Sequence, residues 1–329
     1  MTTLSTATSS FKPPRFLRNT HAQSLLASAG PRKYLATRRA RKVTAAAEEV
    51  IIDCGDQVRL QGYYSAHGNQ AARKLVILLH GWLGSESSSY LLSAAARLYD
   101  NGFDVFRLNL RDHGETHHLN KELFHSARLA EVVNAMAEIQ RLYPHDNYYL
   151  CGFSLGGNFA LRVSAEHNKE NTRFSAIAAV CPVINPECAM ATISTAMWVY
   201  PWYFVKKWKR SLRKKLTHFP ELGFASELER ARNLDDLNKF FVPKHTPYQQ
   251  LNDYFRAYSV AGERLASVSV PTHIIHAADD PVVSAADLQQ ASRKGTLSVE
   301  ITAHGGHCGF LKNYQLHSWV DDRLLALFD

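Results

Sequence analysis

The residues around Ser154 have the pattern of an activated nucleophile. Ser154 is the central residue of the sequence GFSLG, which directly follows the apolar run NYYLC and precedes the helix-like segment GNFALRV. In a nucleophile elbow, a sharp turn between a strand and a helix exposes the serine hydroxyl, and flanking glycines let the two backbones cross closely. The pattern predicts that Ser154 attacks an acyl carbon. The alternative is an incidental serine in a glycine-rich turn.

A serine hydroxyl is protonated at neutral pH, so its chemistry needs a base and a group that orients that base. His307 lies in HGGHCGF, just after the strand-like run LSVEITA, where glycines let a loop carry the imidazole over the sheet edge. We therefore predict His307 as the base, with His304 as its nearest rival. Asp280 follows the run THIIHA and precedes Pro281, which fixes the turn. We favour Asp280 over its neighbour Asp279 as the orienting carboxylate.

Two backbone amides are candidates for stabilising an oxyanion. Leu155 follows the nucleophile at the start of a predicted helix, where amide hydrogens point outward. Trp82 lies in the turn HGWLG, directly after the buried run KLVILLH. A turn in this position supplies the second donor of such sites. The alternative for Trp82 is a plain strand-to-helix turn.

The order of apolar segments predicts an α/β architecture. Buried-strand runs alternate with segments of helical spacing, which favours a mostly parallel central sheet with helices on both faces. Two short runs that precede them are typical of a β-hairpin. The alternation stops in an aromatic and Lys-rich stretch that we interpret as an inserted helical cap or lid. The predicted organisation is an N-terminal arm without a clear period, packed on the domain or partly mobile (1–45), a core in two parts (46–183 and 271–329) and the cap (184–270).

Positive charge is concentrated in the predicted cap. The formal net charge is +8, and seven of the ten residues from Lys206 to Lys215 are Lys or Arg. Aromatic residues from Trp198 onward run into this stretch, a combination typical of membrane interfaces. Residues Trp198–Lys215 are therefore a candidate for peripheral contact with an anionic membrane. The equally weighted alternative is that the aromatic rings pack the cap onto the core and the charges form a solvated face. Because no recognition motif accompanies the charge, we expect no nucleic-acid partner.

Cysteine usage and the N-terminus bear on location. The five cysteines are widely spaced, without a CxxC pair or the spacing of metal ligands, which favours a reducing compartment. The N-terminal residues lack the apolar segment of a signal peptide, and no run of about 18 apolar residues occurs. We expect a cytoplasmic protein, peripheral to a membrane at most.

A cluster at 112–118 (DHGETHH) suggests a metal site, but without an HExxH helix we expect no metal there.

Together these motifs resemble the α/β-hydrolase superfamily, and in detail its YheT-like branch. The resemblance covers nearly the whole chain and rests on the arm FKPPRFLRNTHAQSLLAS, the turn HGWLGSESSSY, the elbow GFSLGGN, the acid loop DDPVV and the closing GGHCGF. The order Ser, Asp, His along the chain also fits it. It implies hydrolysis of esters, often fatty-acyl esters, without a metal or organic cofactor. The segment RDHGETHHLN departs from the branch, which often has a glycine- and cysteine-containing segment there.

The sequence therefore predicts a serine hydrolase of carboxylic esters. Ser154, His307 and Asp280 would form and release an acyl-enzyme, and the apolar cap would cover a lipophilic acyl chain. Two alternatives remain open at this point. One is an acyltransferase or thioesterase with the same three residues, and the other is a catalytically silent lipid- or protein-binding member of the fold.

Overall fold

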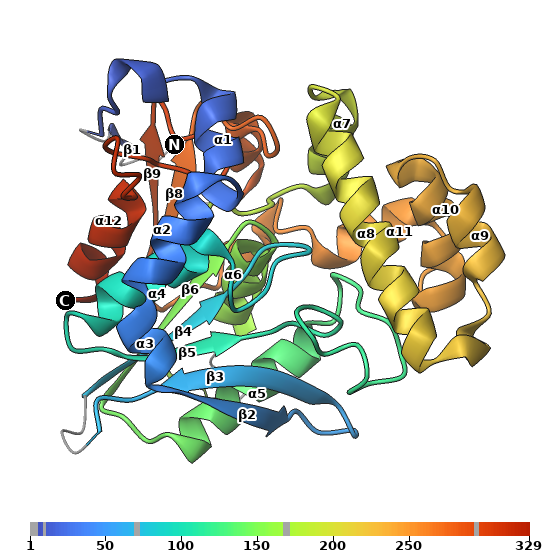
Figure 1. Ribbon diagram of the computed structural model, residues 1–329, viewed down its shortest axis with the longest axis horizontal. Helices are drawn as coiled ribbons and strands as arrows, with labels where there is room; N and C mark the ends of the chain where they lie inside the picture. Colours follow the sequence, from blue (N-terminus) through green and yellow to red (C-terminus); the bar gives the residue numbers. More distant parts are fainter. Residues whose placement is uncertain (1–5, 9–10, 69–72, 167–171, 293–295) are drawn as a thin grey trace.

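A nine-stranded sheet forms the centre of the computed structural model, which describes residues 6–8, 11–68, 73–166, 172–292 and 296–329 (Figure 1). From one edge to the other, the strands are β1 (Thr6–Thr8), β9 (Leu297–Thr302), β8 (Thr272–Ala277), β7 (Ala176–Val180), β6 (Asn147–Phe153), β4 (Lys74–Leu79), β5 (Asp104–Leu108), β3 (Arg59–Ser65) and β2 (Ala47–Asp53). Strands β3 and β2 pair antiparallel, as does β3 with β5, and the other neighbours are parallel. The predicted hairpin is β2–β3. The predicted mostly parallel sheet is confirmed.

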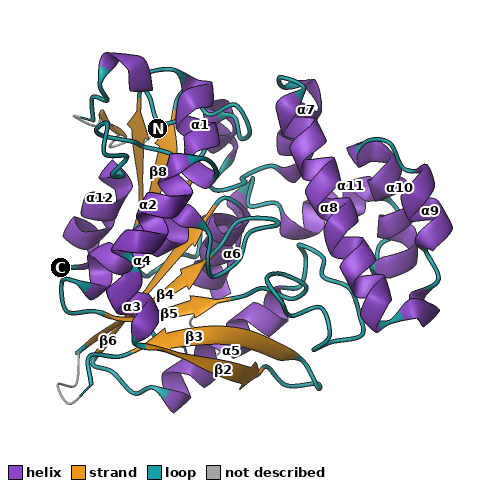
Figure 2. Cartoon of the chain, in the orientation of Figure 1, coloured by secondary structure: helices purple, strands orange, loops and turns teal. Residues whose placement is uncertain are grey.

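Helices cover both faces of the sheet (Figure 2). On one face lie α4 (Ser89–Tyr99) and α12 (Trp319–Phe328), and on the other lie α5 (Leu129–Leu142) and α6 (Leu155–Glu166). The central strands are therefore apolar on both sides, as parallel strands between two helical layers must be. Strand β5 is buried at every position. Because parallel strands end at the same edge, the loops after β4, β6, β8 and β9 meet there.

Residues 184–270, the predicted cap, are largely helical and lie to one side of the sheet, beyond the ends of its strands (Figure 1, yellow to orange). Five α-helices follow one another in this segment: α7 (Pro186–Thr195), α8 (Val199–His218), α9 (Ala225–Arg230), α10 (Leu234–His245) and α11 (Leu251–Tyr258). Within the described residues, no helix is both long enough and apolar enough to span a bilayer.

The N-terminal arm is more regular than its sequence pattern indicates. It forms the helices α1 (Thr20–Ser28), α2 (Pro31–Arg39) and α3 (Arg41–Ala45), where we expected no regular period. Local signals set their ends, since the Asn19 side chain caps α1 and Pro31 occupies the first turn of α2. The buried residues are mostly small, which gives a weak hydrophobic pattern: Ala27, Ala36, Ala40 and Val43. Residues 1–5 and 9–10 of the predicted arm lie outside the described residues.

Candidate active site

Steric crowding shapes the turn that carries Ser154. Ser154 joins β6 to α6 with φ at 54°, the left-handed region that side chains other than glycine rarely adopt. A Cβ on Gly152 would lie 2.0 Å from the carbonyl oxygen of Gly156. A Cβ on Gly156 would lie 2.5 Å from the carbonyl oxygens of Leu79 and His80. The two glycines therefore let α6 approach both β6 and the end of β4, which holds the serine in its turn.

The structure brings Ser154, His307 and Asp280 together from three loops. Nε2 of His307 lies within hydrogen-bond distance of the Ser154 hydroxyl, at 2.9 Å, and Nδ1–H of His307 donates to Oδ2 of Asp280 across 2.8 Å. The other oxygen of Asp280 accepts from the amides of Val282 (2.8 Å) and Val283 (3.0 Å). This arrangement can move a proton from the serine to the imidazole while the carboxylate faces the imidazolium that forms.

Electrostatics link the imidazole to the carboxylate. Burial lowers the pKa of His307, but the negative charge of Asp280, helped by Cys308 and by the hydrogen bond, outweighs burial and raises that pKa to about 9. Burial alone would raise the pKa of Asp280. The charge and the hydrogen bond of His307 lower that pKa by more than burial raises it, so the pKa of Asp280 lies below its usual value. The pair thus favours an ionised carboxylate beside an imidazole that holds its proton firmly.

The rival residues occupy different positions. Within the described part of the chain, the carboxylate of Asp279 forms no hydrogen bond with His307; its Oδ1 accepts from the amide of Gly306 across 2.9 Å. His304 lies beside Asp279, with 3.8 Å between Nδ1 and Oδ2. Asp279 therefore braces the loop that carries His307, and Asp280 is the carboxylate that reaches the imidazole.

Helix α1 of the N-terminal arm supports the same loop, which the sequence did not indicate. The hydroxyl of Ser24 accepts from the backbone amide of His307 across 2.9 Å and donates to the carbonyl of Thr20 across 2.8 Å. Thr20 itself donates to the carbonyl of Asp279. Gln23 donates to the carbonyl of Leu311 and accepts from its amide at 2.7 Å. No pattern in the arm distinguishes these polar residues from ordinary surface positions.

The turn that follows β4 lies beside the nucleophile, as the prediction for Trp82 requires. A Cβ on Gly81 would lie 3.1 Å from Cβ of Ser154, and the Gly81 amide donates to the Tyr90 hydroxyl across 3.0 Å. Leu83, one residue beyond Trp82, has φ at 58°. Leu155, the other predicted donor, is the first residue of α6, so its amide belongs to the positive end of the helix dipole.

His113 fixes this turn and belongs to the cluster that suggested a metal. Its Nδ1–H donates to the carbonyl of Arg111 across 2.7 Å, and its Nε2 accepts from the amide of Leu83 across 3.0 Å. Burial lowers the pKa of His113 to about 4, which keeps the ring neutral at pH 7, as an accepting Nε2 requires. His113 is thus a positioning residue that sequence analysis missed.

The rest of that cluster joins the core to α8. Asp112 pairs with Nζ of Lys215 at 2.7 Å, His117 hydrogen-bonds the hydroxyl of Ser211 at 2.8 Å, and Glu115 pairs with Lys214. Lys215 is only 1% exposed. Lys215 therefore does not belong to a solvent- or membrane-facing surface, because it is buried and paired with Asp112, whereas Arg210 and Arg213 of the same stretch are exposed.

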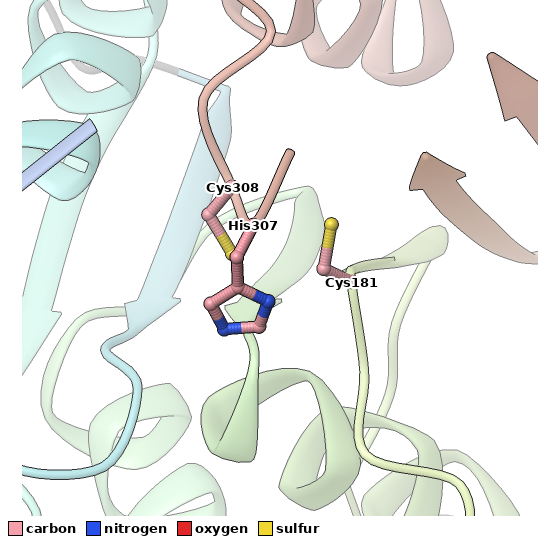
Figure 3. Close-up of side chains that lie close together, drawn as sticks. All are labelled: Cys181, His307 and Cys308. Carbon is pink, nitrogen blue, oxygen red and sulfur yellow. The ribbon is translucent and has the colours of Figure 1, made fainter. Parts of the chain in front are cut away.

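Two cysteines lie beside His307 (Figure 3). Cys181 follows β7, Cys308 follows the histidine, and the ligand atoms of the three residues lie within 4.8 Å of one another. All five cysteines are free thiols. Both nitrogens of the His307 ring are already hydrogen-bonded to Ser154 and Asp280. A metal ion on this group would therefore have to displace the contacts described above.

Ser154 lines an apolar pocket. The pocket encloses about 720 Å³, including space open to solvent. Its core side is formed by the loop after β5, the Trp82 turn, the start of α6 and the loop after β8. Its other side is formed by helices α7, α8, α10 and α11. The Trp82 ring stacks on Phe204 with centroids 5.4 Å apart and meets Trp208 edge-on at 5.1 Å. Such a pocket suits an apolar chain attached to a reacting group at Ser154.

Comparison with known proteins gives concordant matches. A family model described as the alpha/beta hydrolase fold matches residues 74–314. The chain is 27% identical over 324 residues to the esterase-type protein YheT of Escherichia coli (strain K12), covering 95% of this chain and 91% of that protein. It is 23% identical to the mouse phospholipase ABHD3 over 82% of this chain and 65% of the relative. The solved Pyrococcus furiosus esterase Pf2001 superposes with a TM-score of 0.55 at 17% identity, covering 88% and 91% of the two chains.

Proposed function

Because the chain belongs to the α/β-hydrolase fold family, we propose that it is a serine hydrolase that cleaves carboxylic esters with a lipophilic acyl chain. The observation that carries the proposal is the hydrogen-bonded series from Ser154 through His307 to Asp280, whose nucleophile lines an apolar pocket. Relatives named as an esterase and a phospholipase support a lipid-like ester as substrate. So does a yeast relative named monoacylglycerol lipase, 24% identical over 83% of this chain.

The proposed mechanism gives each of these groups one role. Oγ of Ser154 attacks the carbonyl carbon while Nε2 of His307 takes the hydroxyl proton, and Asp280 stabilises the resulting imidazolium. The amides of Trp82 and Leu155 donate to the oxyanion of the tetrahedral intermediate. His307 then gives its proton to the leaving alkoxide, and the alcohol departs. Water, deprotonated by His307, attacks the acyl-enzyme and releases the acid.

Residues 184–270 act in this proposal as a cap over the core formed by residues 46–183 and 271–329. Helices α7, α8, α10 and α11 supply most of the apolar wall that faces Ser154, so an acyl chain lies between cap and core. Removing an apolar chain from water contributes roughly 0.8 kcal/mol per buried CH₂, which favours longer esters until the pocket is full.

We also propose that the N-terminal part of α8 contacts an anionic membrane peripherally. Trp198 and Trp202 are 72% and 52% exposed, and the ammonium of Lys206 lies 4.6 Å from the Trp202 ring centroid. Exposed tryptophans beside cations match the composition of membrane interfaces. Cosedimentation with vesicles that contain phosphatidylglycerol should fall for Trp198→Ala/Trp202→Ala; unchanged binding, or no binding by the unaltered protein, would contradict this part.

The decisive experiment replaces the nucleophile. Ser154→Ala should remove turnover of p-nitrophenyl octanoate and labelling by a fluorophosphonate probe while leaving the circular dichroism spectrum unchanged. Ser164→Ala, on the same helix α6, is the matched control and should be labelled normally. Labelling that survives in Ser154→Ala would refute the assignment. A protein that is never labelled would instead be the silent binding member of the fold.

The same assay distinguishes a hydrolase from a transferase or thioesterase. Products are analysed with and without an added alcohol, and octanoyl thioesters are compared with octanoate esters. Free octanoic acid as the main product from the oxygen ester supports hydrolysis. Transfer of most acyl groups to the added alcohol, or a strong preference for the thioester, would favour the alternative.

A further inference from the structure

Two buried polar side chains line the apolar pocket, and in each of them one nitrogen atom has no hydrogen-bond partner within the described residues. His125 belongs to the loop before α5, in the core, and Asn238 belongs to α10, in residues 184–270. They are 6% and 3% exposed. Nδ1 of His125 and Nδ2 of Asn238 have no partner among the residues that the structure describes. Ser154 lines the same pocket.

Such atoms are uncommon in folded proteins because water is lost without replacement when a polar group is buried. Next to His125, the backbone amide of Ser126 donates to the hydroxyl of Tyr254 across 3.0 Å, so that amide has its partner within the protein. Two unpaired nitrogens on the walls of a ligand-sized space therefore indicate that a ligand pairs with them. Apolar pockets typically use a few such polar groups to fix the orientation of the ligand.

The chemistry of the two groups limits that ligand. Burial, followed by the positive charges of Arg128, Arg111 and Arg162, lowers the pKa of His125 to about 3, so its ring is neutral at pH 7. The Asn238 amide is neutral as well. A neutral imidazole nitrogen either donates or accepts, depending on its tautomer, and the amide Nδ2 donates. An uncharged hydroxyl can pair with both kinds of group, because it can donate one hydrogen bond and accept others.

We propose that this pocket is specific for esters of hydroxylated acyl chains, whose hydroxyl pairs with Asn238 Nδ2, with His125 Nδ1 or with both. The inference rests on the proposed function and deepens it: the acyl carbonyl lies at Ser154, and the hydroxyl lies part-way along the chain, between core and cap. Esters of plain hydrocarbon chains fit the same space but leave both nitrogens unpaired.

The test compares p-nitrophenyl decanoate with p-nitrophenyl esters of hydroxydecanoic acids in which the hydroxyl moves one carbon at a time. For at least one position, kcat/KM should exceed that of the plain ester by about 10- to 100-fold, the range expected when a buried polar group gains a partner. A kcat/KM that is highest for plain decanoate, with every hydroxylated ester slower, would overturn the proposal.

Variants of the two polar residues test whether they cause the preference for hydroxylated esters. Asn238→Leu, which keeps the size of the side chain, and His125→Phe, which keeps a ring against Tyr248 and Tyr254, should each lower the ratio of hydroxylated to plain ester toward one. Ile193→Val, at an apolar position of the same pocket, is the matched control and should change both esters by a similar factor. A ratio that neither polar variant changes would refute the role of these residues. If one variant fails to fold, the other gives the same test.

Failure of the proposed function would be visible separately. Loss of turnover for all esters, or turnover that persists in Ser154→Ala, would contradict ester hydrolysis at this site and not the recognition of a hydroxyl. Binding of decanoic and hydroxydecanoic acids to Ser154→Ala, followed by fluorescence of the pocket residues Trp82 and Trp208, then tests that recognition without catalysis. Tighter binding of the plain acid than of every hydroxy acid would overturn it.

Discussion

The two halves of the candidate site are held in place by different forces. Ser154 is held by close contact between backbones, because Gly152 and Gly156 leave no room for a Cβ. His307 and Asp280 lie in loops held by hydrogen bonds, several of them from the distant helix α1. The nucleophile half thus depends on backbone packing around a few consecutive residues, and the base half depends on side-chain hydrogen bonds from a distant helix.

This difference teaches how each half tolerates change. Backbone atoms at 2.0 to 2.5 Å from a new Cβ cannot rotate away as a side chain can. A single substitution in the nucleophile half should therefore cause a large loss of activity. A lost hydrogen bond in the base half leaves a loop that still closes part of the time. We therefore expect large losses of activity for substitutions in the nucleophile half and smaller losses for substitutions in the base half. Asp280 is the exception in the base half, because it acts on the imidazole itself.

The largest effect is expected for Asp280→Asn. The amide cannot stabilise the imidazolium and favours the wrong tautomer of His307, so kcat should fall about 10⁴-fold, as in other Ser-His-Asp sites. Asp279→Asn is the matched control in the same turn. Because the carboxylate of Asp279 accepts from the amide of Gly306 and lies near His304, the loss of its charge should cost about tenfold or less. Equal losses in the two variants would contradict the assignment of the carboxylate.

The second-largest loss of kcat is expected for Gly156→Ala. The new Cβ must push α6 away from the carbonyls of Leu79 and His80, which displaces the amide of Leu155 from the oxyanion. We expect a loss of about 10²- to 10³-fold in kcat and a destabilisation of about 1–3 kcal/mol. Gly157→Ala, whose Cβ would lie 3.1 Å from its nearest neighbours, should be milder in both respects. Kinetics and thermal unfolding measure the pair, and similar values for both would show that crowding does not hold the elbow.

The pH dependence of kcat/KM tests the base half. His307 must be neutral to accept the serine proton, and its pKa is raised to about 9, chiefly by the charge of Asp280 acting against burial. The neutral fraction, and with it kcat/KM, should therefore fall roughly tenfold per pH unit below about pH 9. Initial rates between pH 6 and 10, corrected for hydrolysis in Ser154→Ala, give the profile. An acid limb near 6.5, the ordinary imidazole value, would show that Asp280 does not hold the proton on His307.

Sequence reasoning succeeded where the determinants are local. The elbow, the strand-helix alternation and the loops after β8 and β9 each depend on a few consecutive residues whose types restrict the backbone, such as the glycines around Ser154. The glycines before His307 and the proline after Asp280 indicated where those loops turn, and in the fold the loops meet because parallel strands end at one edge. The choice between Asp279 and Asp280 could not be settled in this way, because it depends on side-chain direction within one turn.

Other features depend on contacts that no local pattern encodes. Ser24 contacts His307 across 283 residues of sequence, and only the folded chain places α1 against that loop. His113 and Lys215 had the types of a metal ligand and of a surface cation. Burial and their partners, Leu83 and Asp112, give them structural roles instead. Residue type restricts what a side chain can bind, and tertiary contacts decide which partner it meets.

The smallest effect is expected for Ser24→Ala. The amide of His307 loses its acceptor, so the loop reaches the geometry seen here in a smaller fraction of molecules; kcat/KM should fall about 3- to 10-fold. Ser28→Ala, at an exposed position of the same helix, is the control and should leave kcat/KM unchanged. Since Asp280 still contacts the imidazole, the acid limb of the pH profile should stay where it is. A shifted limb would show that α1 changes the charge environment of His307, and an unchanged rate would show that the base half is held without the arm.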